Sequence, residues 1–443
     1  MITLFKQLLL SKRSSLLSSS LVLIAIIGYA ILLFQKGLNP GDDIEIVHMA
    51  QTQSFFEILM STTETNTGIF YRPIIRLCAK PLVFLFGVWP PAFTGLVFIF
   101  TLSALWLYYQ LFKKLNIQTL YINLGLLTAL SSPFLWSGWT WLADLGSLII
   151  VNLILITLTL FFCSPTKKNI IIGSLFIIPL ALICKEHGLI LPALFFGYFI
   201  LNRHYVHSIL PIVFVILYFI LRYYLFGEFL PTNMFVRESG FFTEMLSVNM
   251  KQERFGTFPY FFYLYTIIAQ FLDVFFTQPH YGQFGFDNFS VVKLFRFGLY
   301  SLTSLVLLIA VLSKKRPHPW FLFTSFSIIV INCILSYKYA EIKVILIAGM
   351  GYCLLIPPLF QHAHHTIQNS HSKVSQFPGI FIVLFFLVWS LNTGIFLKKI
   401  PLIMERDKLS YQDYLINNQF PIDKIYHSKY KSTYLKSREW YFK

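Results

Sequence analysis

The chain has 443 residues, of which 56% are hydrophobic and 18% aromatic, whereas only 12% are charged. With a mean hydropathy of +0.67, this composition excludes a soluble domain and a disordered chain, and it is typical of an integral membrane protein with many spans. The formal net charge of +16 indicates contact with anionic lipid at the inner leaflet, and we expect no nucleic acid partner.

The N-terminal region predicts a membrane helix over residues 16–34. This apolar stretch is too long for a signal-peptide core, and no small-residue cleavage site follows it. Because basic residues precede it, we expect a retained first helix whose amino end is cytoplasmic. The polar segment 35–80 is then expected to form a first outer loop that is partly helical.

Later apolar stretches are separated by basic residues, prolines and short polar breaks. Helices are expected over 91–112, 120–136, 145–162, 170–184, a sixth segment that returns to Arg203, 208–226, 297–312, 320–336, 344–360 and 377–397. Residues 227–296 form a long outer loop, which contains one ambiguous apolar piece, 258–276.

Whether 258–276 spans the membrane decides the topology. Gln270 and Asp273 argue against a span that faces lipid, which gives eleven transmembrane helices. The basic tail 398–443 would then lie outside, so the positive-inside bias favours twelve. We expect an all-α integral membrane protein with about eleven transmembrane helices, formed by one module over 1–397 and followed by a polar tail.

The sequence contains none of the specific motifs of P-loop, serine-hydrolase, zinc-protease or dinucleotide sites. The five cysteines are scattered and predict neither a disulfide framework nor a zinc site. The candidate residues are therefore charged groups at expected helix ends. Asp42 and Asp43 follow the first helix, where a desolvated carboxylate can act as a base. They equally suit a turn and the start of a surface helix over 44–58.

Further polar residues lie at other expected breaks. Arg72 and Arg76, with Tyr71, close the first loop and suit a phosphate group, or snorkel beside lipid. Trp139 precedes Asp144 on the next outer turn, a pairing that suits a sugar ring but also an interfacial aromatic belt. Two more charged breaks follow, Lys185-Glu186-His187 and Tyr337-Lys338-Tyr339, and eleven helices would place all of them on one face.

Taken in order, these segments resemble the membrane-embedded C-type glycosyltransferases (the GT-C superfamily), which use polyprenyl-phosphate-linked sugars. The similarity is greatest to the protein O-mannosyltransferase-like branch and to the aminoarabinose transferase of lipid A. Its residues are Asp42-Asp43, Tyr71-Arg72-Pro73, Asp144, Cys184-Lys185-Glu186 with Leu191-Pro192, and the end of the seventh helix from Arg222 to Gly227. The later motif departs from the family, because Tyr337-Lys338-Tyr339 stands where an Arg-Tyr pair is usual.

The resemblance implies an inverting transfer of a sugar from a polyprenyl-phosphate donor to a hydroxyl of a lipid, glycan or protein acceptor, on the outer face of the membrane. The short chain and the lack of a lumenal disulfide pattern indicate a bacterial inner membrane, which makes that face periplasmic. For this transfer we expect Asp42 or Asp43 as the base and Asp144 as a positioning acid. Tyr71, Arg72, Arg76, Lys185 and Lys338 would bind the donor phosphate, and Glu186, Trp139, Tyr337 and Tyr339 would position substrate. Some members bind a divalent cation, so metal dependence stays open, and no other cofactor is expected.

Two other classes of protein remain open. A transporter or flippase of lipid-linked substrates also requires ionisable residues within the membrane domain. Against it, the sequence has no internal repeat, and most of its acids lie at expected helix ends. A non-catalytic scaffold would leave the polar breaks on one face unexplained.

Overall fold

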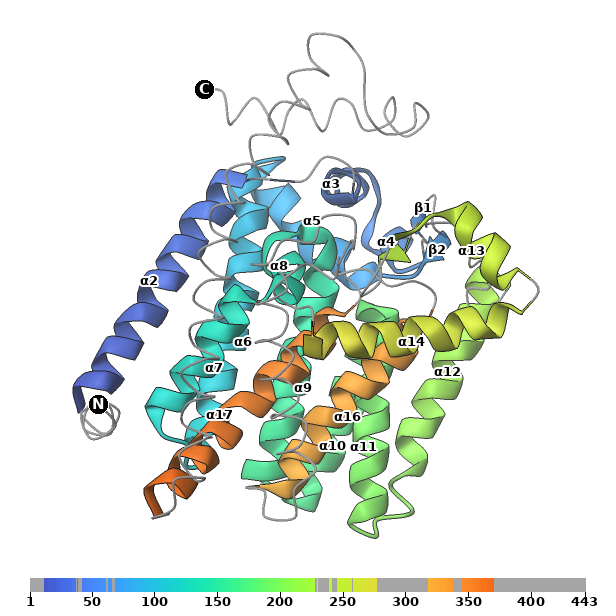
Figure 1. Ribbon diagram of the computed structural model, residues 1–443. Coiled ribbons are helices and arrows are strands. Elements are labelled where there is room, and N and C mark those ends of the chain that lie inside the picture. The colour runs from blue at the N-terminus through green and yellow to red at the C-terminus, as the bar shows by residue number, and fades with distance from the viewer. Residues whose placement is uncertain are drawn as a thin grey trace.

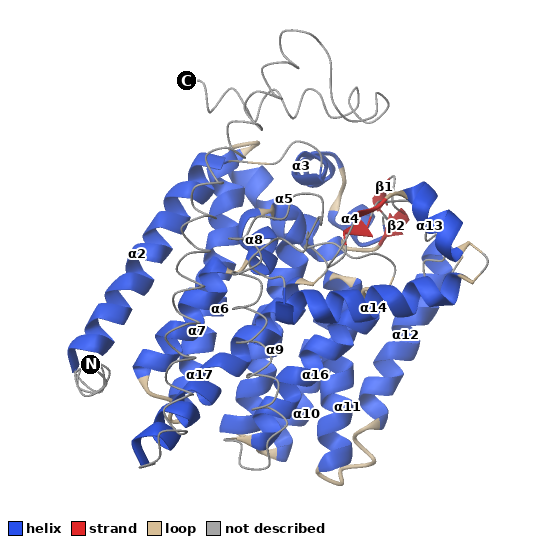
Figure 2. Cartoon of the chain, in the orientation of Figure 1, coloured by secondary structure: helices blue, strands red, loops and turns tan. Residues whose placement is uncertain are grey.

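The computed structural model describes residues 12–36, 38, 42–60, 63–65, 68–227, 229, 239–240, 245–256, 258–276, 318–337 and 345–369. These residues are overwhelmingly helical, as expected (Figure 2). The strands among them form two short antiparallel hairpins, β1 (Thr63–Thr65) with β2 (Gly68–Phe70) and β3 (Ser239–Gly240) with β4 (Met245–Leu246).

A bundle of apolar helices forms the body of the molecule (Figure 1). Its members are α2 (Lys12–Lys36), α6 (Pro90–Lys114), α7 (Thr119–Ser131), α9 (Leu145–Cys163), α10 (Lys167–Cys184), α11 (Ile190–Leu201), α12 (Ile209–Phe226), α16 (Pro319–Leu335) and α17 (Leu346–Asn369).

Within the described ranges, four helical segments are long and apolar enough to cross a membrane: Ser15–Gln35, Pro90–Lys114, Leu142–Cys163 and Ile209–Phe226. The number rises to five if the bent pair formed by α13 (Val248–Phe255) and α14 (Pro259–Phe276) counts as one span. The chain therefore has the helices of a membrane-embedded protein. The count of eleven or twelve stays a prediction, because the helices expected over 297–312 and 377–397 lie outside the described residues.

Helix α9 is the central helix of the bundle. Within its most apolar window 78% of residues are buried, against 17% for α12 and 22% for α2. It packs against α6 and α10, and less extensively against α11 and α17. An apolar helix that is buried all round belongs to a core, whereas the exposed apolar faces of α2 and α12 suit lipid.

The helix expected over 120–136 is interrupted by a proline. α7 ends at Ser131, and α8 (Pro133–Thr140) begins as a separate short helix. Ser132 between them has an extended backbone (ψ 121°), because proline disfavours the helical conformation of the residue before it and supplies no amide donor. The break brings the chain into the 3-10 turn η1 (Leu142–Asp144) at the start of α9.

The segment 35–80 contains helices, as predicted, but its last helix extends further than expected. α3 (Asp42–Thr52) and α4 (Phe55–Met60) precede the first hairpin, and α5 (Pro73–Phe86) follows it. α3 packs along α5. The Lys80 ammonium of α5 donates to the carbonyl oxygens of Ala50 (3.0 Å) and Gln53, so a cation satisfies the carbonyl end of α3.

The two ends of the bundle differ in charge. At one end α2 begins and α11 turns into α12, whereas α3 lies at the other (Figure 1). The first end carries basic residues at the termini of the antiparallel helices: Lys113, Lys114, Lys167, Lys168 and Arg203. The opposite end, where α10 gives way to α11, is called the network end below, after the ion pairs that it contains.

The turn from α10 into α11 leaves no room for a side chain at Gly188. A Cβ at this position would meet the backbone carbonyl of Ala181, whereas one at Gly197 would meet nothing within 4 Å. Gly188→Ala should therefore lower the stability by about 1 to 3 kcal/mol, seen as a lower thermal unfolding midpoint in detergent. Gly197→Ala serves as the matched control and should leave the midpoint unchanged or raise it. Equal midpoints for the two variants would contradict this account of the turn.

Candidate functional site

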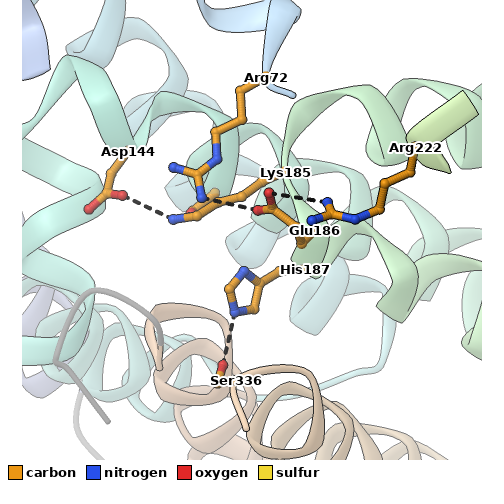
Figure 3. Close-up of polar contacts among 8 residues, drawn as sticks. Arg72, Asp144, Lys185, Glu186, His187, Arg222 and Ser336 are labelled. Carbon is orange, nitrogen blue, oxygen red and sulfur yellow. Dashed lines mark hydrogen bonds and ion pairs between the residues drawn. The ribbon is translucent and has the colours of Figure 1, made fainter. Parts of the chain in front are cut away.

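A buried ion pair joins the η1 turn, at the start of α9, to the break between α10 and α11 (Figure 3). The Lys185 Nζ lies 3.1 Å from Asp144 Oδ1 and donates to Ser147 Oγ at 2.8 Å. The two charged side chains are only 4% and 7% exposed. Burial lowers the pKa of Lys185, an effect that the Asp144 carboxylate opposes. Lys185 is held as one partner of a close pair, as a buried cation requires.

Glu186 faces two guanidinium groups (Figure 3). Its Oε2 lies 3.0 Å from Arg72 Nη2, at the start of α5, and its Oε1 lies 4.0 Å from Arg222 Nη1, near the end of α12. Burial favours the protonated form of Glu186. The Arg72 guanidinium, a backbone hydrogen bond at Glu186 and the Arg222 guanidinium together outweigh burial, and they lower the pKa of Glu186 to about 2. Glu186 is therefore a carboxylate that draws two cations together.

The backbone at Lys185 explains why adjacent side chains reach opposite partners. Lys185 ends α10 with an extended conformation (φ −169°, ψ 159°), and the 3-10 turn η2 (Glu186–Leu189) starts at the next residue. Successive side chains in extended backbone point to opposite sides. Lys185 therefore reaches α9, while Glu186 reaches Arg72 and Arg222.

His187 continues the network toward α16. Its Nε2 lies 2.9 Å from Ser336 Oγ, and the Ser336 carbonyl accepts a hydrogen bond from Gln270 Nε2 of α14 at 2.7 Å. Burial lowers the pKa of His187 to about 3, and the Lys185 cation acts in the same direction. The imidazole is neutral near pH 7, so it links η2 to the end of α16, and through Ser336 to α14, without adding charge.

The ion pairs of this network join three cations to two carboxylates. Arg72 and Arg222 face Glu186, and Lys185 faces Asp144. Arg72 and Glu186 are 23% and 22% exposed, whereas the other three side chains are almost fully buried. A partly open Arg–Glu pair can receive an anion, with the Arg fork as its contact.

The two acids left open in the first loop have different surroundings. Asp43 is 1% exposed, and its Oδ1 accepts a hydrogen bond from the backbone N–H of Ala143 at 2.8 Å. Asp42, in the same first turn of α3, is exposed. Asp43 thus ties the first loop to the turn that carries Asp144, and it is the member of the pair directed toward the network.

The remaining predicted residues are distributed differently. Tyr71 and Arg76 are buried beside the network end (8% and 1% exposed), and Trp139 is in the core (1% exposed), where its carbonyl accepts a hydrogen bond from the Tyr29 hydroxyl. Tyr337 packs edge-on against Tyr263 of α14, with ring centroids 4.8 Å apart. Lys338 and Tyr339 lie outside the described residues.

Several network members were not selected as site residues from the sequence. Arg222 was recognisable as the one charged residue in the apolar run 208–226, and that signal alone would have justified including it. Ser147, Ser336 and Gln270 carry no comparable signal. No group of three or more His, Cys, Asp or Glu side chains comes together in the described part of the chain, so nothing there bears on metal dependence.

Comparisons with protein-family models, with curated proteins and with solved structures find no match for this chain.

The buried pair gives a direct test of the network. Asp144→Asn or Lys185→Met should each lower the stability by about 3 to 5 kcal/mol, because each leaves an uncompensated buried charge. The double variant removes both charges and should lose less than the sum of the two single losses. Chemical unfolding in detergent measures the cycle. Strictly additive losses would mean that the two groups do not interact.

The low pKa of His187 predicts a pH dependence of stability. The histidine is protonated below its ordinary value of 6.5 in the unfolded chain but only below about 3 in the folded one. The unfolded chain therefore binds the extra proton between these values, and stability falls as the pH is lowered through this window. Unfolding midpoints measured from pH 7 to pH 4 should fall less steeply in His187→Asn than in the unsubstituted chain. An unchanged slope in His187→Asn would refute the assignment.

Proposed function

We propose that the protein is an inverting glycosyltransferase that moves a sugar from a polyprenyl-phosphate donor to an acceptor hydroxyl. The observation that carries the proposal is the network of Arg72, Asp144, Lys185, Glu186 and Arg222 at one end of an apolar bundle. Its members are the charged residues, other than Asp42 and Asp43, through which the sequence resembles the GT-C superfamily. The geometry adds that these residues, far apart in sequence, lie together.

The network supplies what the leaving phosphate requires. Cleavage of the bond between the anomeric carbon and the phosphate oxygen leaves the electron pair on the lipid phosphate, and fixed cations stabilise that charge. Arg72 and Arg222 are held by the same carboxylate, Glu186, and Lys185 by Asp144. In this proposal the carboxylates orient the cations, and the cations bind the donor phosphate through the partly exposed Arg72 guanidinium. Tyr71, Arg76 and Lys338 are retained from the sequence prediction.

Asp43 is the favoured base. Its carboxylate is buried and directed toward the turn of Asp144, a setting in which it can remove the proton of the acceptor hydroxyl as the oxygen bonds to the anomeric carbon. Attack opposite the leaving phosphate inverts the configuration. Asp42 is exposed and is assigned to the acceptor side. Trp139, Tyr337 and Tyr339 remain predicted substrate-positioning residues, and a divalent cation stays an open requirement.

The distribution of basic residues supports a periplasmic location for this chemistry. The end opposite the network carries the paired lysines of α6 and α10 and the start of α2. Basic helix ends favour the cytoplasmic side. We therefore place the amino end in the cytoplasm and the network on the periplasmic face of a bacterial inner membrane, where the acceptor is a lipid, a glycan or a protein.

The test is release of labelled sugar from a polyprenyl-phosphate donor by purified protein in lipid. Asp43→Asn keeps an oxygen that accepts from Ala143 but loses the base, so turnover should fall by about a hundredfold or more. Arg222→Met should weaken donor binding and raise the donor KM. Glu57→Gln changes an exposed acid of the same loop and is the matched control, with turnover unchanged.

Two outcomes would contradict the proposal. Full turnover in Asp43→Asn would remove that residue from the chemistry. No release of sugar from any donor, together with movement of the lipid-linked donor between the leaflets of vesicles, would favour the transporter or flippase instead.

A further inference from the structure

Helix α14 has its apolar side chains on the outside and its polar side chains on the inside. Tyr260, Phe261, Leu264 and Ile268 follow one face and are 80%, 62%, 54% and 50% exposed. The opposite face carries Thr266, Gln270 and Asp273, which are 0%, 0% and 2% exposed. A surface helix in water has the reverse distribution. The exposed face of α14 therefore suits an apolar medium.

The buried polar face is anchored to the bundle. α14 packs against α16 and α17, and Gln270 Nε2 donates to the Ser336 carbonyl at the end of α16. Ser336 also contacts His187, the neighbour of Glu186. These contacts therefore hold α14 at the same position along the length of the bundle as the ion-pair network.

The preceding helix has the opposite character. α13 exposes Gln252, Glu253 and Arg254, and its mean hydropathy is that of a polar helix. The chain then bends by 120° into α14, which runs across the bundle and not along it (Figure 1). A polar helix followed by an apolar one after a sharp bend is the arrangement expected where a chain passes from water to a membrane surface.

We infer that α14 is an interfacial helix that lies in the plane of the membrane surface at the network end, with its exposed stripe in contact with the acyl chains of phospholipids. Three observations support this partner. The stripe carries no charged residue, because Asp273, the one charged side chain of α14, is buried. It contains aromatic residues, which are enriched at the membrane interface. Its direction crosses that of the apolar helices, so it cannot follow them through the bilayer.

This placement has a consequence for the site. If α14 lies at the boundary between head groups and acyl chains, the network to which Ser336 joins it lies at the same depth. The head group of a lipid-anchored molecule would reach Arg72 and Arg222 while its chain stays in the bilayer. The inference about α14 itself does not depend on the proposed function.

The experiment measures depth. Leu264→Cys and Ile268→Cys are labelled with an environment-sensitive fluorophore in the full-length protein, which is reconstituted in phosphatidylcholine–phosphatidylglycerol vesicles. Spin-labelled lipids carry the quencher near the head group or near the end of the acyl chain. An interfacial helix places its apolar face about 5 to 10 Å into the boundary, so shallow quenchers should remove more fluorescence than deep ones at both positions.

Two control positions calibrate the result. Leu217→Cys, 54% exposed on α12, should be quenched more by deep than by shallow lipids, because α12 is a candidate span. Glu253→Cys on α13 should respond only to a quencher in water. The unsubstituted chain, labelled in parallel, gives the background from its five cysteines, three of which are buried. Deep quenching at positions 264 and 268 would show a spanning helix, and quenching by neither lipid would show a face covered by protein. Either result overturns the inference.

Discussion

The structure depends on keeping charged side chains paired inside an apolar bundle. An isolated charge at such depth costs several kcal/mol, so each must find a partner from a neighbouring element. Asp144 on the η1 turn before α9 and Glu186 after α10 meet this requirement for Lys185, Arg72 and Arg222. The pairs therefore define how α5, α9, α10 and α12 meet, and the extended backbone at Lys185 is the local feature that allows one short segment to serve both pairs.

The helices could be predicted where hydropathy alone determines them. The expected segments 145–162, 170–184 and 208–226 agree with α9, α10 and α12 to within a few residues. The prediction was wrong at 120–136, where Pro133 splits the segment, and it missed α5, which begins in the polar loop at Pro73. Both differences have a local cause, since proline ends one helix and starts the other. The orientation of 258–276 could not be read from composition, because it depends on which face of the helix meets α16.

The site was predictable to the extent that a charge in an apolar sequence is conspicuous. Lys185 and Glu186 were selected in this way, whereas Arg72 and Asp144 were selected on the expected outer loops, and the four residues lie together. The choice between Asp42 and Asp43 required the direction of each side chain, which neighbouring residues on a helix do not share. Ser336 could not be identified as a site residue from the sequence, because serine is common near helix ends. Its importance comes from its contacts with His187 and Gln270, across more than sixty intervening residues in each case.

The arrangement also bears on the choice between a transferase and a transporter. A transporter exposes its ionisable groups alternately to two sides, so its pairs must be exchanged during the cycle. Here Lys185 is held by Asp144 and Ser147, while Arg222 and Arg72 share one carboxylate on the adjacent residue. If one of these elements moved, a buried charge would lose its partner on another element. This cost opposes alternation between the two sides of the membrane. A fixed set of cations with one partly exposed Arg–Glu pair is instead suited to receive an anion from one side, which is what transfer from a lipid phosphate requires. This physical argument supports the proposed transferase.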